Sequence, residues 1–257
     1  MLQILNKCNT IIIPIEEVIQ NKNERFVSKA TIKKRVFFLI ERTVGFAFDD
    51  ENIGVLEGWS HTVRGDRKIN VPFTYETGKS GIGDERPHGV IWYWKNITIT
   101  NEFKKDQSIQ INFEGCDYHL DLWVNGVYKG SHDGAYTRFA FELGKFAEGE
   151  EVLLSIRVED PHSEEQVRGK QRWLSDNYGC WYVQTTGIWK DVWLEQVSDD
   201  YVEKIKITPD IYKKTVTIHT MCHSNKENLI MKSDVYFEGK FINSVSGKLE
   251  AGVCQWI

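Results

Sequence analysis

The aromatic and basic side chains between residues 168 and 182 are those whose types and spacing could do chemistry. Arg168 precedes Trp173, and Trp181 and Tyr182 follow in the same glycine-bearing stretch. An aromatic ring can stack on the apolar C–H face of a sugar, and a guanidinium can donate hydrogen bonds to the hydroxyl groups at its rim. These four residues are therefore the candidate carbohydrate contacts. The alternative is a long loop between strands whose aromatic side chains pack on a neighbouring domain.

The sequence contains no recognisable catalytic constellation. The Gly-x-Ser-x-Gly motif, the Walker A motif and a complete dinucleotide glycine fingerprint are all absent. Asn-Glu dipeptides end at Glu24 and Glu102, and retaining glycosidases require two carboxylates about 5–5.5 Å apart. Glu102 lies where an apolar strand pattern gives way to a polar stretch, so we interpret it as a turn residue. We therefore predict that this chain holds no catalytic residue.

One short segment has the residue types of a metal site. His219 and His223 flank Cys222, but zinc requires three or four ligands and no second ligand pair lies nearby in sequence. Side chains of a strand also alternate between its two faces, which separates Cys222 from its histidine neighbours. We therefore predict neither a metal site nor a cofactor.

Composition limits the classes of partner and the compartment. The 257 residues include 32 basic and 37 acidic side chains, and this acidic balance argues against nucleic-acid binding. No run approaches the roughly 20 apolar residues that cross a membrane. The cysteines are odd in number and form no Cys-x-x-Cys pair, as is typical of a reducing compartment. We therefore expect a cytoplasmic protein with no membrane or nucleic-acid partner.

From about residue 45 the hydrophobic pattern has a period of two, with turn signals every 8 to 12 residues, which predicts an all-β fold. Asn125-Gly126 is the dipeptide best suited to a two-residue type I′ hairpin turn. In two expected strands, residues 120–124 and 152–158, apolar residues alternate with other residues, which predicts a buried inner face. This face consists of Leu120, Leu122, Val124, Val152, Leu154, Ile156 and Val158.

The pattern divides the chain into three parts. Residues 45–200 have the strand set of one β-sandwich and end in a short polar linker. Residues 201–257 read as the start of an immunoglobulin-like sandwich, a fold that normally takes about 100 residues. We therefore expect this second sandwich to be incomplete, with an exposed apolar face around Val216, Ile218, Val235 and Phe237. In residues 1–44 the period is not decisive, and we expect one short helix or strand between Glu24 and Glu41.

Several motifs then recur in a recognisable order. They are Trp123-Val124-Asn125-Gly126, Gly130-Ser131-His132-Asp133-Gly134-Ala135-Tyr136-Thr137, Arg168-Gly169-Lys170-Gln171, Thr185-Thr186-Gly187-Ile188-Trp189 and Val192-Trp193-Leu194-Glu195. This order closely resembles the N-terminal sugar-binding domain of glycoside hydrolase family 2, which includes β-galactosidases, β-glucuronidases and β-mannosidases. The resemblance covers residues 45–200 and continues weakly to 257, whereas residues 1–44 match it poorly.

The resemblance implies a jelly-roll (galactose-binding-like) β-sandwich, an immunoglobulin-like domain and a (β/α)₈ barrel that bears both catalytic glutamates. A barrel needs about 250 residues of its own, so it is missing here. The chain would then be the N-terminal, non-catalytic portion of a retaining β-glycosidase, with a β-glycoside and the barrel as its partners. The family's usual sugar-contacting Asp corresponds to Trp181, so the resemblance does not choose between galactose and glucuronate.

Two alternatives to this function remain open. The chain could be a stand-alone carbohydrate-binding module, for which tight and selective sugar binding would be evidence. It could also be the inactive product of a truncated reading frame, which the poorly matching N-terminus and the incomplete second sandwich would favour. In each case we expect no hydrolase activity from the chain alone.

Overall fold

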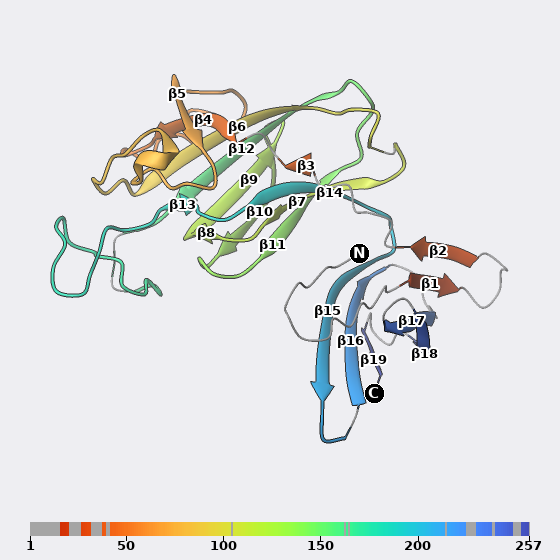
Figure 1. Ribbon diagram of the computed structural model, residues 1–257. Coiled ribbons are helices and arrows are strands. Elements are labelled where there is room, and N and C mark those ends of the chain that lie inside the picture. Colours follow the sequence, from red (N-terminus) through yellow and green to blue (C-terminus); the bar gives the residue numbers. More distant parts are fainter. Residues whose placement is uncertain are drawn as a thin grey trace. The chain divides into compact units, whose positions relative to one another are not determined.

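The computed structural model describes residues 16–20, 27–31, 38–39, 42–103, 105–161, 163, 165–213, 215–224, 230–237, 240–248 and 253–256 (Figure 1). These residues are almost entirely strands and loops, with one short 3₁₀ turn, η1 (Gly78–Ser80). None of their helices is long and apolar enough to cross a membrane. The chain forms two compact units, residues 36–196 and residues 197–257 together with strands from the N-terminal segment.

The first unit, here called the sandwich unit, is a jelly-roll β-sandwich whose larger sheet has six strands. In spatial order they are β10 (Val127–Asp133), β9 (His119–Val124), β12 (Glu151–Glu159), β6 (Val90–Thr98), β4 (Thr43–Phe48) and β5 (Arg67–Asn70). The pairs are antiparallel, and β12 lies between β6 and β9 (Figure 1). Sheet order thus differs from chain order, so the core depends on contacts between distant segments.

The second sheet of the sandwich unit has four strands. Its order is β11 (Phe139–Gly144), β7 (Ser108–Phe113), β14 (Val192–Val197) and β3 (Phe38–Leu39). A separate two-stranded sheet pairs β8 (Cys116–Asp117) with β13 (Gly187–Ile188). Strand β13 follows the longest loop of the unit, so this small sheet fixes where that loop ends.

The core of the sandwich unit lies on the inner face that the alternation predicts. All seven predicted inward residues of β9 and β12 are buried, which confirms the prediction. On the opposite face of β9, Asp121 and Trp123 are partly exposed. Asn125 and Gly126 adopt φ angles of 50° and 79°, as the predicted type I′ turn requires.

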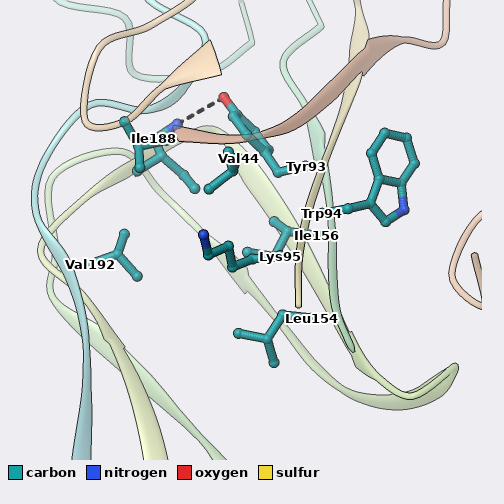
Figure 2. A pocket seen from close by; sticks show the side chains of 9 residues that line it. Val44, Tyr93, Trp94, Lys95, Leu154, Ile156, Ile188 and Val192 are labelled. Atoms are coloured by element: carbon teal, nitrogen blue, oxygen red, sulfur yellow. Dashed lines mark hydrogen bonds between the residues drawn. The ribbon is translucent and has the colours of Figure 1, made fainter. Parts of the chain in front are cut away.

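A small cavity lies inside this core. Its volume is about 20 Å³, and its lining is apolar. Figure 2 shows Val44, Leu154 and Val192 around it, and the Tyr93 hydroxyl accepting a hydrogen bond from the Ile188 N–H. A buried water needs two to four polar partners, which this apolar lining does not offer. The cavity is therefore a packing void and not a ligand site.

The second unit, here called the C-terminal unit, also contains two antiparallel sheets. One holds β15 (Tyr201–Asp210), β16 (Thr215–His223) and β19 (Val253–Trp256). The other has the order β18 (Lys240–Lys248), β17 (Ile230–Phe237), β1 (Glu16–Gln20) and β2 (Val27–Thr31). Strand β1 joins β17 through the pair Gln20–Ile230 and pairs along its length with β2.

Strand β1 was not foreseen from the sequence, because its partner β17 lies at the far end of the chain and local patterns do not show it. Strand β2 lies within residues 24–41, where one short helix or strand was expected. The expected exposure of the apolar face is wrong for Ile218, which is 2% exposed, and Val235 is half-buried. Ile218 lies on the central strand of its sheet, in register with Ile207 of β15 and Trp256 of β19. Val216 is exposed as expected, and the side chain of Phe237 lies outside the described residues. The predicted boundaries at residues 45 and 200 stay predictions.

Candidate carbohydrate site

The loop between β12 and β13, residues 160–186, carries all four predicted contact residues and is here called the aromatic loop. It leaves the larger sheet after Glu159 and returns to the small sheet at Gly187. Figure 1 shows it in teal, extending beyond the ends of the strands. Loops of this length without their own secondary structure are uncommon and usually functional.

The outer part of the loop folds back on itself through backbone hydrogen bonds. Tyr182 donates its N–H to the carbonyl of Lys170 at 2.9 Å, and Arg172 donates to the carbonyl of Tyr182 at 2.7 Å. A tight turn reverses the chain between Tyr178 and Trp181, and Gly179 provides a φ angle of 54° there. The tip is therefore closed by a parallel bridge between Gln171 and Tyr182 and by the tight turn from Tyr178 to Trp181.

Three aromatic rings gather at this tip. Trp173 contacts Trp181 edge to face, with ring centroids 4.7 Å apart, and Tyr178 with centroids 5.6 Å apart. These three residues are here called the aromatic cluster, and each is only half-buried. Tyr182 lies next to the cluster in sequence and is 58% exposed. Partly exposed indole and phenol rings with fixed orientations form the kind of surface on which a sugar ring stacks.

Arg168 occupies a different position from the aromatic residues. Its side chain is buried and donates hydrogen bonds to the carbonyls of Ser163, Pro161 and Arg172. It also forms an ion pair with Asp160, with the nitrogen and oxygen 3.3 Å apart. All of these partners belong to the aromatic loop, so Arg168 holds the base of the loop together. Its direct contact with a sugar stays a prediction.

A second buried arginine ties the tip of the loop to the rest of the sandwich unit. Arg172 donates to the Gln184 side chain at 3.1 Å, to the Asn177 side chain at 3.1 Å and to the Glu85 carbonyl at 2.7 Å. Gln184 donates to the same Glu85 carbonyl at 3.1 Å. The guanidinium thus bridges both arms of the aromatic loop and a neighbouring loop, which limits the conformations available to the aromatic cluster.

Two buried carboxyl groups lie beneath the returning end of the loop. Glu76 accepts the Thr186 N–H at 3.0 Å, and Asp117 accepts the side-chain N–H of Gln171 at 2.7 Å. Burial raises the pKa of Glu76 to about 7. Burial and the charge of Asp160 raise the pKa of Asp117 to about 7.

The sequence analysis missed Asp160, Arg172, Glu76 and Asp117. The signal for Asp160 and Arg172 is weak but present, because a charged residue at the end of an apolar strand and a second Arg beside Trp173 both suggest an anchored loop. Glu76 and Asp117 lie far from the loop in sequence, so only the tertiary structure connects them to it.

The other sequence candidates lie apart from this loop. Glu102 is exposed in a turn after β6, and Glu24 lies outside the described residues. His219 and His223 are exposed on β16. Within the described part of the chain, no three His, Cys, Asp or Glu side chains are grouped so that they could hold a metal ion.

The comparison with known families bears directly on this unit. The model of the family described as glycosyl hydrolases family 2, sugar binding domain, matches residues 40–198. The chain therefore belongs to glycosyl hydrolase family 2. The matched range contains the aromatic loop and all of the sandwich unit from β4 onward.

Individual relatives of this family 2 chain agree with the assignment. A β-galactosidase of Thermoanaerobacterium thermosulfurigenes is 27% identical over 188 residues, which are 72% of this chain and 25% of the relative. A β-glucuronidase of Formosa agariphila is 25% identical over 162 residues, 62% of this chain and 16% of the relative. The chain thus spans at most about a quarter of these two relatives.

The solved structures show the same fold. The β-glucuronidase of Ruminococcus gnavus in complex with uronic deoxynojirimycin superposes with a TM-score of 0.66 at 17% identity, over 87% of this chain and 39% of that chain. At this identity the likeness supports the β-sandwich fold and no finer property.

Proposed function

We propose that the aromatic loop is a carbohydrate-binding site, and that the chain serves as the non-catalytic, sugar-binding portion of a retaining β-glycosidase. The aromatic cluster carries this proposal. Its half-buried rings lie on a loop that the buried Arg172 anchors, in a domain of family 2 whose model is described as sugar binding. Trp173, Trp181 and Tyr182 are the proposed contacts, and Arg168 supports them from the base of the loop.

The proposed ligand is the sugar of a β-glycoside, and the proposed partner is a catalytic (β/α)₈ barrel. The names of the relatives make β-glucuronides and β-galactosides the sugars to test first. We also propose a cytoplasmic location, which the free thiols of Cys116, Cys180 and Cys222 support.

Calorimetric titration with phenyl β-glucuronide and phenyl β-galactoside tests the site. We expect weak binding of one of them, with a Kd on the order of 1 mM, because an open loop covers only part of a sugar. Trp173→Ala or Trp181→Ala should abolish this binding. Tyr128→Ala removes an exposed aromatic side chain from β10 and is the matched control. Unchanged binding in both tryptophan variants would exclude this loop.

Incubation with nitrophenyl β-glycosides tests the non-catalytic assignment. We expect no turnover, because the carboxyl groups beneath the loop are buried and retaining hydrolysis needs two carboxylates that reach the glycosidic bond. Turnover that disappears when a carboxylate of this chain is substituted would refute the assignment. Tight and selective binding without turnover would instead favour a stand-alone module.

A further inference from the structure

Asp117 and Glu76 hold both arms of the aromatic loop from below. Asp117 accepts a hydrogen bond from the Gln171 amide nitrogen, and the Gln171 amide oxygen accepts the Thr185 N–H at 2.6 Å. Glu76 accepts the N–H of Thr186, the next residue. The two carboxyl groups therefore fix the point where the outgoing arm at Gln171 and the returning arm at residues 185–186 meet.

Among the residues that the structure describes, neither carboxyl group forms an ion pair with a basic side chain. Asp117 is 2% exposed and Glu76 is 7% exposed, and one oxygen of each is buried without a hydrogen-bond partner. The buried cation nearby is Arg168, which pairs with Asp160. An ionised Asp117 or Glu76 would be a buried charge that its hydrogen bonds and the more distant Arg168 compensate only in part, which is unfavourable.

Of the other groups that face the two carboxyls, Asp160 makes ionisation harder, whereas the charge of Arg168 and the hydroxyls of Thr74 and Thr186 favour it. Asp117 faces the negative Asp160 at the end of β12 and the thiol of Cys116 on its own strand, with Arg168 as the opposing cation. Glu76 faces the hydroxyls of Tyr75, its neighbour in sequence, and Tyr93 of β6. None of these groups except Arg168 stabilises a negative charge by its own charge.

We propose that Asp117 and Glu76 form a protonation-controlled clamp, which fixes the aromatic loop when both are neutral and releases it when either ionises. A carboxylate formed here reaches water only if Gln171, Thr185 and Thr186 move away from it. The clamp rests on the proposed function, since it regulates the same sugar site. Ordering of the aromatic cluster, and with it sugar affinity, then falls as the pH rises through neutrality.

Hydrogen–deuterium exchange of the full chain at pH 6 and pH 8, corrected for the intrinsic rate, tests the clamp without any sugar. Because both groups have a pKa of about 7, we expect exchange of residues 171–186 to rise by up to about tenfold for each carboxyl group. Asp117→Asn and Glu76→Gln keep the acceptor oxygens but cannot ionise. The double variant should therefore show no rise, and each single variant a smaller one.

Asp176→Asn is the matched control, because Asp176 is an exposed carboxylate on the same loop. This variant should show the full rise seen in the unmodified chain. Two results would overturn the clamp. One is exchange that does not depend on pH in the unmodified chain. The other is a rise with pH in each single variant that is as large as in the unmodified chain.

Calorimetry at the two pH values separates the clamp from the proposed function. Weaker binding of a phenyl β-glycoside at pH 8, restored in the double variant Asp117→Asn with Glu76→Gln, supports both. A pH-dependent loop that binds no sugar at either pH would leave the clamp standing and reject the carbohydrate site.

Discussion

At the scale of single residues, the sandwich unit depends on a close approach between backbone and side chain. Gly187 adopts a φ angle of 94° where β13 begins, and the Tyr93 hydroxyl lies where a Cβ atom would be. The same hydroxyl accepts the Ile188 N–H. A side chain at this position would therefore strain the backbone and displace a buried aromatic residue.

Gly187→Ala should lower the free energy of unfolding of the sandwich unit by about 2–4 kcal/mol, from backbone strain together with overpacking. Urea denaturation followed by tryptophan fluorescence measures this change. Gly78→Ala is the control, because no atom lies within 4 Å of the added Cβ there. A loss below about 0.5 kcal/mol for Gly187→Ala would show that the contact with Tyr93 relaxes easily.

The raised pKa values of Glu76 and Asp117 predict how stability depends on pH. Their values of about 7 compare with ordinary values of 4.5 and 3.8, so the folded state holds more protons than the unfolded state between these limits. The free energy of unfolding is therefore highest below about pH 4 as far as these groups contribute. It falls as the pH rises to about 7, by on the order of a few kcal/mol.

Denaturation series at several pH values check this direction. Asp117→Asn should flatten the profile in part, because its neutral side chain has no proton to lose. A stability that rises across the same window for the unmodified chain, and equally for the variant, would contradict the assignment.

At the scale of elements, the aromatic loop is held by side chains at its base and at its tip. Arg172 bonds to both arms of the loop and to the Glu85 carbonyl. Arg172→Ala leaves the side-chain oxygen of Gln184 without its donor and removes one of the two donors to the Glu85 carbonyl, which costs about 1–3 kcal/mol where these groups stay buried. This cost falls on the loop, because the bonded groups belong to loops and not to the sheets.

We therefore expect Arg172→Ala to weaken sugar binding at least tenfold and to raise hydrogen exchange in residues 173–182. The thermal midpoint of the sandwich unit should change little. Lys170→Ala is the control, since Lys170 is an exposed basic residue of the same loop. Equal loss of binding in the two variants would point to a simple charge effect.

The elements that the sequence predicted are those whose signals are local. The alternation of Leu120, Leu122 and Val124 revealed the inner face, and Asn125-Gly126 revealed a turn. The support of the aromatic loop could not be predicted, because Glu76, Asp117 and Asp160 come from three separate segments. The pairing of β1 with β17 was missed for the same reason. Arg168 was read as a possible sugar contact, whereas its four hydrogen bonds are all internal.

At the scale of the whole molecule, the main core cluster runs from Val44 to Leu194, within the sandwich unit, so we expect the two units to unfold separately. Leu154 is buried in the sandwich unit, so Leu154→Ala should lower that unit's stability by about 2–5 kcal/mol through cavity formation. Deletion of residues 1–35 removes β1 and β2 and should destabilise only the C-terminal unit. Hydrogen exchange resolved by segment distinguishes the two effects.

Val235→Ala supplies the control for the first substitution, because Val235 lies in the other unit. It should leave the protection of residues 43–196 unchanged. Loss of protection throughout the chain after the deletion would mean that the sandwich unit depends on the N-terminal strands.

The doubled-back tip of the aromatic loop has an evolutionary consequence. Its bonds to Lys170 and Arg172 use the backbone of Tyr182, which any residue supplies. Of the side-chain bonds that close its base, the Arg172–Asn177 contact alone involves a side chain of positions 173–182. Mutations within the tip can therefore accumulate without weakening the sandwich that displays it. Family members could diverge in the sugars they recognise by exchanging this segment as a cassette, while the scaffold stays under selection for folding alone.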